Sequence, residues 1–170
     1  MKIGMVFGST TGNTEDAAEL IRAELAGRVD EVHNVQGMEL QDMTQYDLLL
    51  VGIPTWDIGQ LQEDWERRLM DVADLDFDGV HVAFFGDGDQ FGYPDNFQDA
   101  MGIIRELFVA CGAKAEVGHW PADDYDYQES KALIDGKFVG LALDDLQQPE
   151  KSEERIQGWV SQVLQEIGVE

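Results

Sequence analysis

Two mainly apolar runs, 48–53 and 80–85, constrain the fold of this chain more than any other feature of its sequence. They are rich in Val, Leu, Ile and Phe and do not alternate with polar residues, which is typical of strands covered on both faces. Shorter apolar runs and amphipathic helical patterns alternate along the rest of the chain. We expect strands at 3–7, 31–35, 48–53, 80–85 and, in two pieces, at 115–118 and 138–143, and helices at about 13–26, 62–72, 95–111 and 151–167.

This alternation predicts parallel βαβ units, in which helices cover both faces of one sheet. With 170 residues the chain can bury a full core, and we expect residues 1–170 to form a single domain. Five strands favour a three-layer, doubly wound α/β fold with strand order 2-1-3-4-5, whose ligand crevice lies outside the carboxyl ends of strands one and three. A polar and aromatic excursion, 119–137, interrupts the last strand. Loops of that length usually carry function or show that a strand is misplaced.

The turn after the first strand has the composition of an anion site. The apolar run 3–7 ends at Gly8, and an amphipathic helix follows a turn made of Ser9, Thr10, Thr11, Gly12, Asn13 and Thr14. Backbone N–H groups and the positive end of a helix dipole bind phosphate in such a turn. The turn contains no Lys or Arg and matches neither the nucleoside-triphosphate loop nor the Gly-x-Gly-x-x-Gly fingerprint. It predicts one terminal phosphate monoester held by neutral donors. The alternative is a polar turn that only caps the helix.

The loops after the third and fourth strands each carry one large aromatic residue beside glycines. Trp56 lies in the loop 54–59, and Tyr93 ends the loop 86–93. Two aromatic side chains that face one crevice form a slot for a flat ring, although a single Trp after a strand is more often a packing residue. Together with the phosphate turn, the slot indicates a planar aromatic ligand joined to one phosphate by a polar spacer.

The charge balance excludes several classes of partner. There are 35 acidic and 11 basic residues, giving a net charge of −24. Nucleic acids and anionic membrane surfaces need a basic footprint and are therefore excluded as partners. The acidity either keeps the protein in solution or steers it toward positively charged proteins.

Targeting and metal signals are weak in this sequence. No apolar run is long enough to cross a bilayer and the N-terminus lacks a signal-peptide pattern, so we expect a cytoplasmic protein without membrane insertion. Cys111 is the only cysteine, which rules out an internal disulfide. The three histidines are scattered, and no metal site is expected.

The motifs resemble those of the flavodoxin family, specifically its long-chain type, over essentially the whole chain. The turn 9–14 is similar to the family's Thr/Ser-x-Thr-Gly-x-Thr motif. The loops 54–59 and 88–93 resemble those whose Trp and Tyr cover the two faces of the flavin. The excursion 119–137 is similar to the insertion that defines the long-chain subgroup.

The resemblance implies noncovalently bound FMN and low-potential, one-electron transfer between redox proteins, with no catalytic residues. The phosphate is expected in the turn 9–14 and the isoalloxazine ring between Trp56 and Tyr93. Asp89 and the backbone of both loops would meet the pyrimidine edge. Asn96 would support the loop, and Asp144 or Asp145 would contact the ribityl hydroxyls. The expected cofactor-binding residues are Ser9, Thr10, Thr11, Gly12, Asn13, Thr14, Pro54, Thr55, Trp56, Asp57, Ile58, Gly59, Asp87, Gly88, Asp89, Tyr93, Asn96 and Asp144.

Two positions depart from the family's pattern. Asp87 stands where many relatives have a neutral hydroxyl residue that assists the phosphate, so its binding role is open. Ile58 lies in the loop expected to turn a carbonyl toward the flavin on reduction, and a β-branched residue resists the left-handed backbone that glycine accepts. We expect Asp57, Asp87 and Asp89 to oppose negative charge on the flavin and to turn outward from the phosphate.

The resemblance also implies the partners. Basic redox proteins such as ferredoxin–NADP reductase, and also photosystem I or other low-potential acceptors, would dock on the edge formed by Trp56, Ile58 and Phe91. We expect a monomer. The alternative function is an FMN-dependent NAD(P)H:quinone reductase on the same scaffold, although nothing in the sequence resembles a dinucleotide site. A phosphoryl-accepting receiver is excluded, because Gly52-Ile53-Pro54 stands where its Asp is needed.

Overall fold

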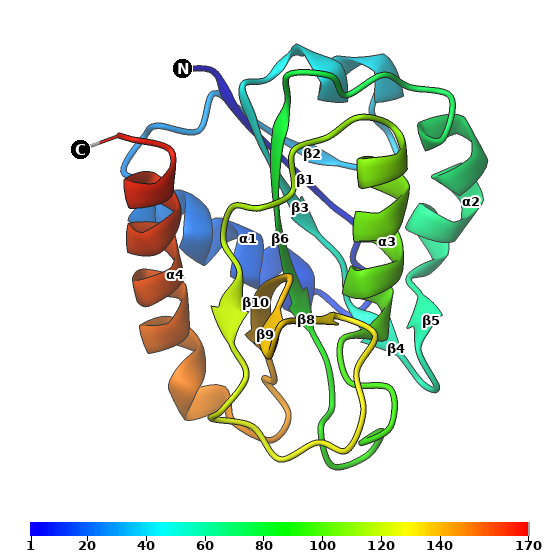
Figure 1. The fold of residues 1–170 in the computed structure, drawn as a ribbon, viewed down its shortest axis with the longest axis vertical. Coiled ribbons are helices and arrows are strands. Elements are labelled where there is room, and N and C mark those ends of the chain that lie inside the picture. The colour runs from blue at the N-terminus through cyan, green and yellow to red at the C-terminus, as the bar shows by residue number, and fades with distance from the viewer. Residues whose placement is uncertain (170) are drawn as a thin grey trace.

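The structure is a computed structural model that describes residues 1–169. Its centre is a parallel five-stranded sheet, seen in Figure 1, with the order β10-β6-β3-β1-β2. This order confirms the predicted 2-1-3-4-5 arrangement, because these strands are the fifth, fourth, third, first and second of the sheet along the chain. Their bounds are Ile3–Phe7 for β1, Glu31–Asn34 for β2, Leu48–Gly52 for β3, His81–Asp87 for β6 and Gly140–Leu143 for β10.

Helices cover both faces of the sheet (Figure 1). Helices α1 (Asn13–Glu24) and α4 (Ser152–Glu166) pack on one face, and α2 (Glu63–Val72) and α3 (Asp99–Ala110) pack on the other. Along β1, Met5 belongs to the core under α1 and α4, whereas Val6 belongs to the core under α2 and α3. The unalternating apolar runs therefore reflect two separate cores, one on each face of the sheet.

The last strand is divided by the insertion, as predicted, but its first piece is shorter than expected. Residues 115–118 form no strand, and only Lys114, just before them, pairs with the sheet, through a single parallel bridge to His81. The chain then turns at Gly118, whose φ is +77°, and β10 occupies the same edge of β6 farther along, with Gly140 opposite Phe84. The insertion carries its own small antiparallel sheet of β7 (Trp120–Pro121), β9 (Lys137–Phe138) and β8 (Leu133–Ile134).

Aromatic side chains hold the insertion against the domain. Phe97 stacks on Tyr127 with ring centroids 5.5 Å apart, and Tyr125 meets Phe138 edge-on at 5.2 Å. The guanidinium of Arg155 lies 4.1 Å from the centre of the Tyr125 ring, and the Tyr125 hydroxyl donates to the Ala142 carbonyl at 2.6 Å. The excursion is therefore packed against the rest of the molecule. In Figure 1 it lies beside the loop that follows β6.

Two short hairpin strands complete the site-bearing end of the molecule. They are β4 (Thr55–Trp56) and β5 (Gln60–Leu61), which pair antiparallel just before α2. Short 3-10 helices, Leu40–Gln45 and Pro149–Lys151, precede β3 and α4. Within residues 1–169 no helix has the length and apolar character needed to span a membrane.

Candidate cofactor site

The carboxyl edge of the sheet brings the three predicted loops together. Gly8 donates its N–H to the Gly52 carbonyl at 3.2 Å, and Gly88 donates to the Leu143 carbonyl at 3.0 Å. These bonds extend the strand pairing by one residue, so the segments 9–14, 54–59 and 88–93 all leave the sheet at one edge. This edge is the switch-point position at which doubly wound folds bind ligands.

The turn 9–14 has unused hydrogen-bonding capacity. Gly12 is the N-cap of α1 with φ +93°, and no side chain caps the helix. Thr14 is 2% exposed, and among the described residues its hydroxyl has no hydrogen-bond partner. The Ser9 hydroxyl accepts from the Gly12 N–H at 3.1 Å, but the N-cap residue has no side chain to accept from the first turn of α1, as a residue that capped the helix would. The uncapped helix end and the unpartnered hydroxyl fit an anion with several oxygen acceptors.

Gln62, the first residue of the predicted helix 62–72 and the N-cap of α2 in the structure, supports this turn. It is fully buried, caps α2 by accepting from the N–H groups of Asp64 and Trp65, and donates to the Thr10 hydroxyl at 3.0 Å. A Cβ on Gly8 would lie 2.3 Å from the Gln62 side-chain oxygen. A polar residue before an amphipathic helical pattern indicates an N-cap, so this role of Gln62 could be predicted from the sequence. Its bond to Thr10 could not, because the two residues are 52 positions apart.

The aromatic loops meet each other at Asp57. Its carboxylate accepts a 3.1 Å hydrogen bond from the Tyr93 hydroxyl, which raises the pKa of Tyr93. Asp57 and Gly59, at the tip of the β4–β5 hairpin, have left-handed φ values of +43° and +89°, whereas Ile58 between them does not. Trp56 is half-buried, with a hollow of about 350 Å³ beside it. Loops bearing the two predicted ring-covering residues are thus in contact.

The loop 54–59 is also tied to α3. The Thr55 hydroxyl accepts from the Ala100 N–H at 3.1 Å. The Asn96 amide donates to Asp99 at 3.0 Å, and a Cβ on Gly59 would lie 2.8 Å from that same Asp99 carboxylate. Asn96 therefore lies against the hairpin, although α3 begins only at Asp99 and not at 95 as the sequence predicted.

The carboxylates of Asp89, in the second loop, and of Asp144, just after β10, are engaged within the protein. Asp89 accepts from the N–H groups of Phe91 and Gly92 and from the Gln147 amide at 3.0 Å. Asp144 is fully buried and accepts from the backbone and side chain of Gln90 and from the Gln147 N–H. Both carboxylates, which were predicted to contact the cofactor, therefore already accept three hydrogen bonds within the protein.

The prediction that all three loop carboxylates turn outward from the phosphate turn is wrong for Asp87. Asp57 is exposed, and Asp89 folds into its own loop, where it accepts from the Phe91 and Gly92 N–H groups. Asp87 accepts from the Asp145 N–H at 2.9 Å and from the Asn13 amide of the phosphate turn at 3.4 Å. Burial raises the pKa of Asp87 to about 7, and the nearby Asp145 and Asp144 act in the same direction. Local sequence could not show that the chain after β10 passes beside Asp87.

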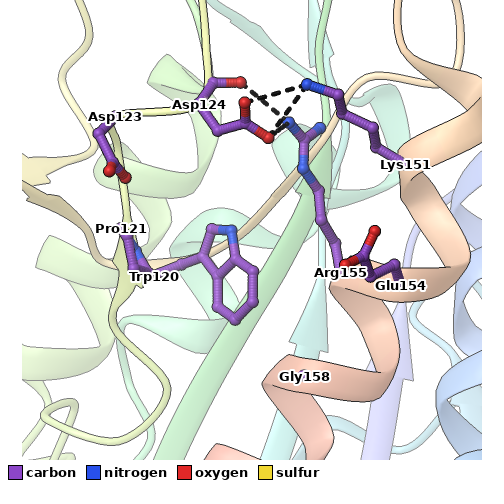
Figure 2. A pocket seen from close by; sticks show the side chains of 8 residues that line it. All are labelled: Trp120, Pro121, Asp123, Asp124, Lys151, Glu154, Arg155 and Gly158. Carbon is purple, nitrogen blue, oxygen red and sulfur yellow. Dashed lines mark hydrogen bonds and ion pairs between the residues drawn. The ribbon is translucent and has the colours of Figure 1, made fainter.

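A second hollow, shown in Figure 2, lies away from these loops. It measures about 380 Å³ and is lined by Trp120, Pro121, Asp123, Asp124, Lys151, Glu154, Arg155 and Gly158. Lys151 and Arg155 both bond to Asp124, at 3.0 and 3.3 Å, so the cations of this hollow are paired within it. None of the predicted cofactor residues lines it. Among residues 1–169 no group of three His, Cys, Asp or Glu side chains could hold a metal.

Fold and site together define a doubly wound α/β domain with a cation-free phosphate turn and two aromatic loops at its switch point. The sequence matches a family model described as Flavodoxin over residues 5–159. It is 49% identical over 168 residues to a flavodoxin of Nostoc sp., covering 99% of this chain and 98% of the relative. A flavodoxin of Synechocystis sp. is 50% identical over 163 residues, covering 95% of each chain.

A solved structure agrees with these relatives. The crystal structure of Fusobacterium nucleatum flavodoxin bound to flavin mononucleotide superposes with a TM-score of 0.91 at 28% identity, covering 97% of this chain and 98% of that one. This chain belongs to the flavodoxin family.

Proposed function

We propose that this protein is a one-electron carrier that binds FMN noncovalently in a single domain, residues 1–170. The observation that carries the proposal is the uncapped start of α1 with the buried, unpartnered hydroxyl of Thr14, beside two loops that each present an aromatic side chain. The FMN-bound relative with the same fold supports the identity of the ligand. When bound, FMN supplies one-electron redox chemistry at its isoalloxazine ring.

The residues of the site bind, orient and shield the cofactor. The turn 9–14 offers N–H and hydroxyl donors to the phosphate without a cation. Trp56 and Tyr93 cover the ring faces and exclude water, while the Asn96–Asp99 pair holds the hairpin that carries Trp56. Added negative charge on the ring is disfavoured in a chain of net charge −24. Each 1.4 kcal/mol of that penalty lowers a one-electron potential by about 59 mV, which is the basis for a low-potential carrier.

The partners are redox proteins with a basic surface. The predicted edge consists of Trp56, which is half-buried, and of Ile58 and Phe91, which are 71% and 56% exposed. We propose this apolar edge within an acidic surface as the docking face, with basic proteins such as ferredoxin–NADP reductase as partners and photosystem I or another low-potential acceptor as further ones. The carrier acts as a cytoplasmic monomer and has no catalytic residue of its own.

An absorption spectrum and a turnover assay test the proposal. Purified protein should be yellow and should release a flavin carrying one phosphate per chromophore. Mixed with NADPH it should stay oxidised until ferredoxin–NADP reductase is added, and should then be reduced. Steady NADPH oxidation without the reductase would instead support the quinone reductase function. Failure of the apoprotein to take up FMN would overturn both.

A further inference from the structure

Asp87 places a carboxylate against the phosphate turn. It is the last residue of β6, and its two oxygens accept from different segments. One accepts from the Asp145 N–H at 2.9 Å, and the other accepts from the Asn13 side-chain amide at 3.4 Å. Asn13 is the first residue of α1 and lies inside the turn proposed to hold the phosphate. The Asp87 carboxyl group is thus one side chain away from the anion site.

The charged groups around Asp87 are all acidic. Asp145 carries a carboxylate that accepts from the Ser152 hydroxyl, and Asp144 is fully buried next to it. The α1 side contributes only the neutral Asn13. In the described part of the chain, none of the ion pairs involves Asp87. Asp87 is half-buried, and a carboxylate that is partly removed from water without a cation beside it favours its neutral form, so its pKa is raised to about 7.

The two protonation states of Asp87 interact differently with a bound phosphate. Ionised, the group adds a negative charge beside a bound dianion and repels it. Protonated, it removes that repulsion and gains an O–H donor, as a hydroxyl residue would have. We propose that Asp87 links cofactor affinity to pH: the phosphate of FMN is bound together with one proton, which is taken from solvent by the Asp87 carboxylate. This inference rests on the proposed FMN site and adds a residue that sets its affinity.

The sign of the linkage follows from the charges. A bound dianion raises the pKa of Asp87 further, so the complex holds more protons than the apoprotein above pH 7. The dissociation constant of FMN should therefore rise with pH, by about tenfold for each further unit of pKa shift. The phosphate itself has its second pKa near about 6 and is mainly a dianion above about pH 7. Of the two groups, Asp87 is therefore the one whose titration extends above pH 7 once its pKa is raised further by the bound dianion.

The experiment is a set of FMN titrations of apoprotein by fluorescence quenching at several pH values between about 7 and 9. For the wild type we expect a roughly tenfold weakening from pH 7 to pH 9. Asp87→Asn should show no such slope and should bind tighter than the wild type at pH 8.5. Calorimetry in two buffers of different ionisation enthalpy should show net proton uptake for the wild type at pH 8, and none for the variant.

Controls separate this effect from general electrostatics. Asp16→Asn removes an exposed carboxylate from the first turn of α1, and the pH slope should remain. Riboflavin lacks the phosphate, and its affinity for the wild type should not change over the same window. Should Asp87→Asn not fold, as judged by circular dichroism, Asp87→Thr serves the same purpose with a neutral hydroxyl.

The outcomes are distinct. A wild-type slope that persists in the Asp87 variants, or that riboflavin shares, would overturn the role of Asp87 and leave the FMN site intact. Absence of FMN binding by the wild type at every pH would overturn the proposed function and, with it, this inference. Loss of the slope and of the proton uptake in the Asp87 variants alone would support it.

Discussion

At the scale of single residues, the hydroxyl of Thr14 allows the anion site to be tested separately from the stability of the apoprotein. The side chain is buried, and within residues 1–169 its hydroxyl has no partner, so the apoprotein gains no hydrogen bond from it. Thr14→Val keeps the shape and removes the hydroxyl. We expect unchanged or slightly higher apoprotein stability in urea, but a roughly tenfold or greater weakening of FMN binding, as for a lost bond to a charged group.

Riboflavin is the internal control for this variant. Because it lacks the phosphate, its affinity should be the same for wild type and Thr14→Val. Thr44→Val, which removes a hydroxyl bonded to the Gln41 carbonyl, should leave FMN binding unchanged. Equal losses for FMN and riboflavin would place Thr14 outside the phosphate site.

The raised pKa of Asp87 also leads to a prediction about the stability of the apoprotein. Its pKa is raised from 3.8 to about 7 by burial, so between these values the folded chain binds more protons than the unfolded chain. The contribution of Asp87 to stability is therefore fully present below pH 3.8 and is lost as the pH rises through 7. Asp87→Asn should gain stability over the wild type from pH 5 to pH 8, by about 1–3 kcal/mol in urea unfolding. A wild-type-minus-variant difference that stays constant with pH, as expected for Asp16→Asn, would contradict this.

At the scale of elements, the sequence predicted what depends on neighbouring residues and missed what depends on distant ones. The strands 3–7 and 48–53 and the start of α1 could be read because each apolar run is continuous and followed by turn residues. Helix α3 begins four residues later than predicted. The left-handed Gln98 lies in its expected first turn, and just before that turn the insertion donates two backbone N–H groups to the Pro94 carbonyl.

The candidate site shows the same division. The turn 9–14 and the two aromatic loops were readable because each is a contiguous motif at a strand end. The residues that support them could not be predicted from the sequence. Gln62 is hydrogen-bonded to Thr10, Gln90 to both Asp144 and Asp126, and Asp87 to Asn13, and each pair is far apart in the sequence. Such partners follow from topology, and the periodicity of one segment carries no information about them.

The β4–β5 hairpin is the element on which the redox behaviour of the site can be tested. Its tip already has left-handed residues at Asp57 and Gly59, and Ile58 between them is 71% exposed. If reduction requires a left-handed backbone at Ile58, the β-branched side chain opposes it by about 1 kcal/mol. Ile58→Gly should then widen the gap between the two one-electron midpoint potentials by about 40 mV in a redox titration. Ile58→Val keeps the branch and should behave as wild type, so equal potentials in all three proteins would discard the idea.

At the scale of the whole molecule, one charge distribution acts on folding and on association in opposite directions. The 35 acidic residues repel one another in the compact chain, and only 11 basic residues offset them. Several of the ion pairs, such as Arg22–Glu19 and Arg67–Glu63, are exposed and contribute little. The excess negative charge therefore destabilises the folded chain while it attracts a basic partner over distances up to about the Debye length.

Added salt should therefore raise stability and slow association in the same protein. Between about 10 mM and 500 mM NaCl we expect the urea midpoint of the apoprotein to increase, because screening weakens self-repulsion. Over the same range the bimolecular rate of reduction by a basic reductase, measured by stopped flow, should fall by about tenfold or more, because the same screening weakens steering. Urea is used as the denaturant because it is uncharged and adds no ionic strength of its own. A urea midpoint that fell with added salt would contradict the self-repulsion argument, and a rate independent of salt would show that the net charge of −24 has no role in bringing partners to the Ile58–Phe91 edge.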